Sequence, residues 1–171
     1  MTNERSFHPQ IVAFCCRHCA YSAADLAGST RLSYPTSLKI LELPCTGRAD
    51  MLQILRTLED GADGVLVAGC LPGTCHYMKG NLHARQRVDY VRSMLTDIGL
   101  DSERVRMVNV SAAMGGLFAE LAAEFAETVR KLGPNPASGG KRGSTFEMVI
   151  PVEQPAAPAS CNHNHHPEVK P

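Results

Sequence analysis

The sequence predicts an α/β protein with a small parallel sheet of about four strands flanked by helices, a flavodoxin-like or Rossmann-like three-layer sandwich. Short apolar runs alternate along the chain with longer amphipathic segments. This alternation is typical of a parallel sheet whose strands are joined by right-handed helical crossovers. Six of the seven cysteines also fall in three short clusters, each just after an apolar run. Open α/β sheets place their sites at the carboxyl ends of the strands, so this placement agrees with the predicted fold.

Four short apolar runs are the predicted strands. In chain order they are residues 11–14, 38–43, 64–68 and 105–110. The first and third runs are almost continuously apolar, which is expected of strands that are covered on both faces. These two runs are therefore predicted to lie inside the sheet.

Apolar residues at helical spacing fill the intervals between the runs. Three such segments end at a glycine, which is a common helix stop. They cover residues 48–60 before Gly61, 81–98 before Gly99 and 113–132 before Gly133. Residues 20–27, after the first cysteine cluster, are predicted to form a short helix.

Composition predicts one domain over residues 8–133 of the 171. From residue 134 onward Pro, Gly, Ser and Ala dominate, so residues 134–171 are expected to form a flexible tail, with residues 146–150 as an edge strand or docking segment. With 17 basic and 17 acidic residues, the chain has no net charge at pH 7, which argues against nucleic acid as the main partner. No apolar stretch is long enough for a membrane span, and no signal peptide is recognised, so a cytoplasmic location is expected.

Three cysteine clusters define the predicted site. They contain Cys16 and Cys19 in a C-x-x-C, Cys45 alone, and Cys70 with Cys75. In a reducing compartment clustered cysteines more often bind metal or carry out redox chemistry than form disulfides. We therefore expect these thiols to share one site. Cys15 should point away from Cys16 because side chains alternate along a strand, and Cys161 lies in the tail.

The spacing of the cysteines leaves the bound group open. Structural zinc is usually bound by two pairs of ligands, and the unpaired Cys45 fits this pattern less well. Iron–sulfur clusters accept four thiolates drawn from several loops. A thioredoxin-like dithiol would need only the C-x-x-C and would leave the other clusters unexplained. The hypotheses are thus an electron-transfer subunit, a zinc-stabilised interaction or assembly module, and a thiol–disulfide oxidoreductase.

Cations and aromatic residues accompany the cysteines. Arg17, Arg48 and His76 are predicted to surround the thiolates, where positive charge would stabilise a reduced cluster. His18 and His76 are alternative ligands, as imidazoles are in Rieske centres. No G-x-G-x-x-G follows the first run, so a self-contained flavin or nicotinamide enzyme is not expected. An exposed apolar surface for a partner subunit is expected near the cysteines. Its candidates are Tyr21, Tyr34, Tyr77 and Met78.

These motifs together resemble the delta subunit of methyl-viologen-reducing hydrogenase, a small iron–sulfur family found beside heterodisulfide reductase. The resemblance runs from Ile11 to Gly133, and so covers nearly the whole predicted domain. It implies a one-domain α/β protein with a 2Fe–2S cluster. Such a protein passes electrons between a hydrogenase or formate dehydrogenase module and a flavin-containing subunit of the heterodisulfide-reductase type. The matching stretches are 14–21, 24–28, 45–48, 61–65 and 69–77, with Gly80, Asn81 and Arg85.

The resemblance also implies the site residues. The family's five cysteines correspond to Cys16, Cys19, Cys45, Cys70 and Cys75. For a cluster with four ligands we predict Cys16, Cys19, Cys45 and Cys75. Cys75 is preferred to Cys70 because it lies nearer a predicted helix start, whose N–H groups favour a thiolate. Cys70, Arg17, Arg48 and His76 are then expected beside the ligands. Departures from the family pattern at His18, Leu71 and Met114 leave the five cysteines intact.

Overall fold

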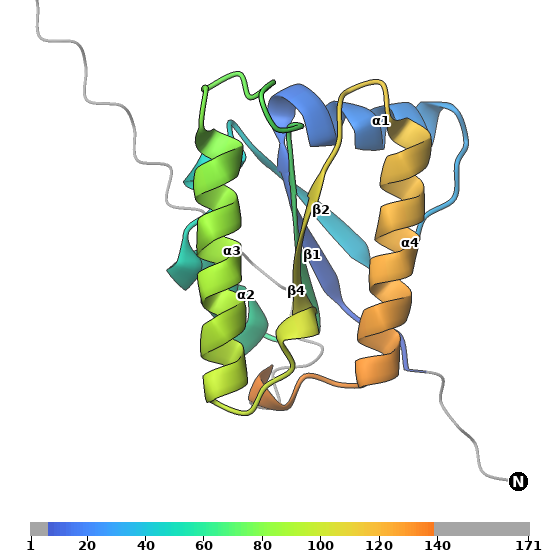
Figure 1. Cartoon of the computed structure of the whole chain (residues 1–171). Coiled ribbons are helices and arrows are strands. Elements are labelled where there is room, and N and C mark those ends of the chain that lie inside the picture. Colours follow the sequence, from blue (N-terminus) through green and yellow to red (C-terminus); the bar gives the residue numbers. More distant parts are fainter. Residues whose placement is uncertain (1–6, 139–171) are drawn as a thin grey trace, which may run out of the picture.

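A four-stranded parallel sheet lies at the centre of the computed structural model, which describes residues 7–138 (Figure 1). The strand order is β2-β1-β3-β4, so β1 and β3 are central and β2 lies at an edge. Every residue of β1 and β3 is buried, as their continuous apolar runs predict. The predicted α/β fold is confirmed. The strands are β1 (Ile11–Cys16), β2 (Leu38–Leu43), β3 (Gly64–Gly69) and β4 (Val105–Asn109).

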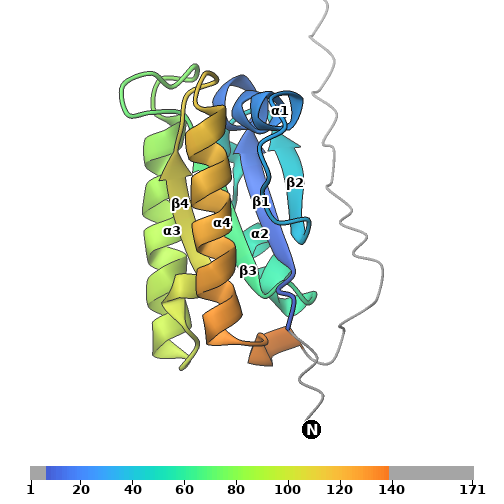
Figure 2. The ribbon, with the colours of Figure 1, turned by 90° about the vertical axis from the view of Figure 1, so that its right-hand side faces the viewer.

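Helices cover both faces of the sheet, which gives the predicted three layers (Figure 2). One face carries α1 (Ser22–Ser29) and α4 (Gly115–Leu132), and the other carries α2 (Met51–Glu59) and α3 (Gly80–Asp97). The short helix predicted after the first cysteines is a π-helical turn, Arg17–Tyr21, that continues into α1. The three longer predicted helices are α2, α3 and α4. Each is followed by a glycine with positive φ, as the stop signals predict, namely Gly61, Gly99 and Gly133.

The core has two halves because alternate residues of β1 face opposite layers. Ile11, Ala13 and Cys15 belong to the half under α1 and α4, together with residues such as Phe118. Val12 and Phe14 belong to the half under α2 and α3. Cys15 packs in the core half under α1 and α4, whereas the Cys16 sulfur lies 3.5 Å from that of Cys70, so the prediction that Cys15 packs inward, away from Cys16, is confirmed. Burial raises the pKa of the Cys15 thiol to about 12, which keeps it neutral.

The amino edge of the sheet is closed by a polar network around Asp63 and Arg104. The Asp63 carboxylate accepts hydrogen bonds from the backbone N–H groups of Gln10 and Asn135, both at 2.9 Å. Arg104 is 4% exposed and donates to backbone carbonyls near the end of α4, which a helix leaves without partners. The acceptors are the carbonyl oxygens of Asp63, Leu132, Gly133 and Pro134.

Packing continues past Gly133, where the predicted domain ends. Asn135 is 3% exposed, and its side-chain amide donates to the carbonyls of Leu58 and Ala62. The segment predicted as a flexible tail therefore begins with residues that pack on the domain. Its later part, with residues 146–150 and Cys161, lies outside the described residues. Within residues 7–138, no helix has the length and apolar character required to cross a membrane.

Candidate metal centre

Five cysteines from three strand ends lie at the carboxyl edge of the sheet. Cys16 ends β1, and Cys19 lies in the π-helical turn that follows. Cys45 comes two residues after the end of β2, Cys70 directly follows β3, and Cys75 lies in the loop before α3. Parallel strands bring these loops to one side of the sheet, as expected from their position in the sequence.

The five thiols form a connected set. The Sγ atoms of Cys16 and Cys70 are 3.5 Å apart. The Cys70 thiol also lies close enough to Cys19, and the Cys45 thiol close enough to Cys75, for each pair to shift the pKa of one of its members. Cys45 interacts electrostatically with Cys16, which joins the two halves of the set. Within residues 7–138, no three His, Cys, Asp or Glu side chains already stand in metal-binding geometry. The cysteines are thus close neighbours that pack as thiols.

Backbone N–H groups are directed at these sulfurs. Gly47 N–H donates to Cys45 Sγ at 3.3 Å. The backbone N–H groups of His18 and Cys19 also face the Cys16 sulfur, and that of His76 faces the Cys70 sulfur. Hydrogen bonds to a sulfur favour its charged thiolate form. The edge of the sheet is therefore prepared for negative charge, although every group involved is a neutral amide.

The surroundings of Cys75 favour its charged form. Burial raises its pKa, but the backbone N–H groups of Asn81, Tyr77 and Gly80 outweigh this effect, so the pKa lies below its ordinary value. Gly80 and Asn81 are the first two residues of α3, where the helix dipole adds positive potential, and Tyr77 lies in the loop before it. In the metal-free protein a larger fraction of Cys75 than of Cys16, Cys45 or Cys70 is therefore thiolate.

The surroundings of Cys70, in contrast, disfavour its charged form. Burial and the neighbouring Cys19 thiol raise the pKa of Cys70 to about 11. Burial also raises the pKa values of Cys16 and Cys45, while backbone N–H donors partly offset the effect. The difference between Cys75 and Cys70 arises because Cys75 is half-buried at a helix N-terminus, whereas Cys70 is fully buried between other thiols.

Two glycines leave the space that the sulfurs occupy. A Cβ atom at Gly80 would lie 2.3 Å from Cys45 Sγ and 3.4 Å from Cys75 Sγ. A Cβ atom at Gly47 would lie 2.9 Å from the Cα atom of Gly80. A side chain at Gly47 would therefore push the loop after β2 away from α3, and a side chain at Gly80 would displace the Cys45 sulfur. The absence of side chains at both positions lets Cys45 and Cys75 come together.

The Thr46 hydroxyl is a further group without a partner at this edge. Thr46 is 1% exposed, and its Oγ1 has no hydrogen-bond partner among residues 7–138. It follows Cys45 directly and packs over Gly69, which precedes Cys70. A buried hydroxyl without a partner is costly, and sulfide or thiolate sulfur would accept its hydrogen. The all-sulfur donor set, the N–H groups and this hydroxyl together fit an iron–sulfur cluster.

The three residues predicted to surround the thiolates, Arg17, Arg48 and His76, are all exposed. Arg17 is exposed and forms an ion pair with Glu42, so its charge already has a partner. Arg48 is exposed on the loop after β2. His76 stacks on His18 with ring centroids 4.1 Å apart, and Tyr77 lies beside both rings. The two imidazoles thus form an aromatic group next to Cys19 and Cys75.

Three polar side chains that hold the cysteine loops were not among the predicted site residues. Asn81 Nδ2 donates to the carbonyl oxygens of Cys70 and Leu71, at 3.1 and 2.9 Å. Asn109 Nδ2 donates to the same Cys70 oxygen at 2.6 Å. Arg87 binds the loop that carries Cys45. Asn109 could have been found as a polar residue at the end of a predicted strand. Arg87 could not, because its contact depends on where α3 passes.

An exposed apolar surface lies next to Cys75, as predicted. Tyr21, Tyr77 and Met78 are 40%, 54% and 81% exposed. Tyr34, the fourth candidate, is partly buried: its ring packs edge-on against Phe118, with centroids 5.8 Å apart, at the border of the core under α4. Met78 has a φ of 63°, which L side chains adopt at a cost of about 1–2 kcal/mol. The loop therefore presents Met78 to solvent in a strained conformation.

Comparison with known proteins gives a consistent set of relatives. The model of the family described as "Methyl-viologen-reducing hydrogenase, delta subunit" matches residues 11–133. The chain is 46% identical over 131 residues to an iron-sulfur subunit of the F420-non-reducing hydrogenase of Archaeoglobus profundus, covering 77% of this chain and 96% of that protein. It is 44% identical over 128 residues to a vhu iron-sulfur subunit of the same kind of hydrogenase from Methanocaldococcus jannaschii, covering 75% and 96%.

A different kind of relative contains a similar domain within a much longer chain. The protein is 41% identical over 133 residues to one subunit of the Ferredoxin:CoB-CoM heterodisulfide reductase of Methanosarcina mazei. This match covers 78% of the present chain but 17% of that protein. Similar domains thus occur both as a separate protein and joined to other domains.

Proposed function

Because the chain belongs to the delta-subunit family of methyl-viologen-reducing hydrogenase, we propose that it is an electron-transfer subunit that carries an iron–sulfur cluster. The observation that carries this proposal is the connected set of five thiols at one edge of the sheet. Five cysteines on three separate loops exceed the needs of a dithiol redox motif. The relatives that are named as iron-sulfur subunits support the same chemistry.

The proposed cluster is 2Fe–2S, held by Cys16, Cys19, Cys45 and Cys75. The lowered pKa of Cys75 and the raised pKa of Cys70 support Cys75 as the fourth ligand, because metal ligands bind as thiolates. Cys70 then remains beside the cluster as a fifth thiol. When bound, such a cluster accepts and releases one electron at a time without other chemistry.

The residues around the thiols would bind this cluster and favour its reduced form. The N–H group of Gly47 donates to the Cys45 sulfur, and those of Gly80 and Asn81 face Cys75, which stabilises added negative charge. The burial of Cys16 and Cys45 keeps water away from the inner side of the site. Cys19 and Cys75 are half-buried, so electrons would enter or leave on their side.

The proposed partners are a hydrogenase or formate dehydrogenase module on one side and a flavoprotein of the heterodisulfide-reductase type on the other. The names of the relatives support the hydrogenase and the heterodisulfide reductase. Tyr77 and Met78 form the proposed contact region because they are exposed and lie in the same loop as Cys75. We place the protein in the cytoplasm, where a reducing environment would keep the thiols free for the cluster.

Metal analysis of anaerobically purified protein tests the proposed function. We expect equal amounts of iron and acid-labile sulfide, a red-brown colour, and an electron paramagnetic resonance signal after reduction. A colourless protein loaded with zinc would instead support a zinc-stabilised assembly module. Full redox activity without Cys45 and Cys75 would support a thiol–disulfide oxidoreductase.

The same measurements on single Cys→Ser variants test the ligand assignment. Cys16→Ser, Cys19→Ser, Cys45→Ser and Cys75→Ser should each lose the native cluster signal. Cys70→Ser should retain it, and Cys15→Ser serves as a control outside the site. A normal cluster in Cys75→Ser together with its loss in Cys70→Ser would show that Cys70 is the ligand.

A further inference from the structure

Cys45 lies on the least supported of the cysteine loops. It follows β2, an edge strand that pairs only with β1. Cys16 and Cys70 follow the central strands β1 and β3, which are paired on both sides. Cys45 is also the one cysteine of the five without a second cysteine on its own loop. Its position must therefore be held from outside the sheet.

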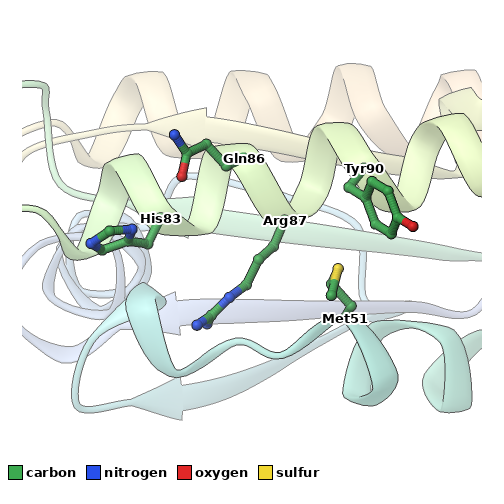
Figure 3. Close-up of a pocket in the computed structure, with 5 residues that line it drawn as sticks. All are labelled: Met51, His83, Gln86, Arg87 and Tyr90. Atoms are coloured by element: carbon green, nitrogen blue, oxygen red, sulfur yellow. The ribbon is translucent and has the colours of Figure 1, made fainter.

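Arg87 supplies this support from α3. Its Nη1 group donates to the carbonyl oxygen of Gly47 at 2.6 Å and to that of Ala49 at 3.1 Å. Figure 3 shows the Arg87 side chain extending from α3 toward the loop between β2 and α2. Side chains on a helix lean toward its N-terminus, so Arg87 reaches back along α3 toward the carboxyl edge of the sheet. Because the donor is charged, these hydrogen bonds are stronger than those of a neutral donor.

The two contacts are connected to the sulfur through Gly47. The N–H of Gly47 donates to Cys45 Sγ, and Gly47 lies against Gly80 at the start of α3. Gly80 and Arg87 are seven residues apart, so they lie on the same face of α3. One helix face thus contacts Gly47 at two points, by close packing at Gly80 and by hydrogen bonding at Arg87.

We propose that Arg87 is a positioning residue for the cluster. It holds residues 46–49 against α3 so that Cys45 stays within reach of the other ligands, and its positive charge behind that loop favours the reduced cluster. This role rests on the proposed function. Arg48, which the sequence predicts beside the ligands, is exposed on the same loop and serves as the comparison.

The test compares four variants of the full chain with the wild type. Arg87→Gln removes the charge and the guanidinium geometry, while Arg87→Lys keeps the charge on a compact group that cannot match the planar guanidinium. Arg48→Gln removes a cation from the same loop. Asn135→Ala weakens the fold at the opposite edge of the sheet, where Asn135 binds two carbonyls, and controls for loss of stability.

Three properties are measured: the rate of iron release to a chelator, the midpoint potential, and thermal unfolding of the cluster-free protein. We expect Arg87→Gln to release iron about 10- to 100-fold faster than wild type, the usual cost of losing a residue that supports a metal ligand. Its midpoint potential should be more negative. Arg87→Lys should release iron quickly but keep a potential closer to that of the wild type. Arg48→Gln and Asn135→Ala should match the wild type in both properties.

Three outcomes would overturn the proposal. The first is wild-type iron release and potential in Arg87→Gln. The second is equally fast release in Asn135→Ala at a similar loss of thermal stability, which would show that global destabilisation is the cause. If Arg87→Gln does not fold, Arg87→Lys provides the test, and wild-type release in that variant is the third. A wild-type protein without iron and sulfide would refute the proposed function itself, which separates the two failures.

Discussion

Replacing Gly80 by alanine should separate cluster binding from folding. The new Cβ atom would lie 2.3 Å from Cys45 Sγ. Non-bonded heavy atoms approach to about 3.5 Å, so the sulfur would have to move by about 1.2 Å. Metal–ligand distances tolerate deviations of about 0.2 Å. The displacement is therefore several times larger than a ligand to iron can accept.

The cluster-free protein should tolerate the same substitution. Without iron, the Cys45 side chain is free to turn to another rotamer at a cost of about 1 kcal/mol. Alanine also has a helix propensity about 1 kcal/mol better than that of glycine, which offsets this cost. We thus expect Gly80→Ala to lose most of its iron and sulfide, while the free energy of unfolding of the cluster-free protein changes little.

Gly116→Ala is the matched control, since Gly116 lies at the start of α4 and a Cβ there meets nothing within 4 Å. It should keep the full cluster content and a similar or higher unfolding temperature. Iron and sulfide per chain, visible absorption and thermal unfolding are measured for both variants. A normal cluster in Gly80→Ala would refute the reasoning, because Cys45 could then not be a ligand in its present position.

Four further predictions concern the backbone, the thiols and the far edge of the sheet. Gly47→Ala should lower the free energy of unfolding by about 1–3 kcal/mol with or without the cluster, because the alanine Cβ meets the Gly80 backbone at 2.9 Å rather than a movable side chain. Unchanged denaturant unfolding would contradict this prediction. In the metal-free protein, Cys75 should be alkylated first at pH 8 and Cys70 much later, since the pKa of Cys75 is lowered and that of Cys70 is raised to about 11. Peptide mass spectrometry would show the order of alkylation, and early modification of Cys70 would contradict the prediction. The pKa of Cys15 rises from 9.0 to about 12 on folding, so above pH 9 the unfolded chain loses this proton before the folded protein does. The metal-free protein should therefore lose up to about 1.4 kcal/mol of stability per pH unit until the folded thiol also titrates. The slope should decrease in Cys15→Ala, and an unchanged slope would exclude Cys15 as its cause. Arg104→Met should lower the free energy of unfolding by about 1–3 kcal/mol for each carbonyl that it leaves buried without a donor. The folded variant should keep a native cluster spectrum, because these carbonyls lie at the opposite edge of the sheet, and a changed spectrum would contradict this.

Local patterns in the sequence predicted much of the fold. Continuous apolar runs predicted the buried strands β1 and β3, and glycines marked the ends of α2, α3 and α4. The position of cysteines after three of the four strands placed them at one edge, because all parallel strands end on the same side of a sheet. These predictions succeeded because they depend on periodicity and chain direction, which neighbouring residues determine.

The sequence by itself thus determined the strands, the helices and the edge at which the cysteines gather. The tertiary structure alone decided which thiols touch, such as Cys16 with Cys70, and which cation serves the Cys45 loop. Arg17, near the cysteines in sequence, is paired with Glu42, whereas Arg87 binds the loop from a helix that lies far along the chain. The physical reason is that the order β2-β1-β3-β4 and the path of α3 result from the packing of whole layers, and no local pattern encodes them.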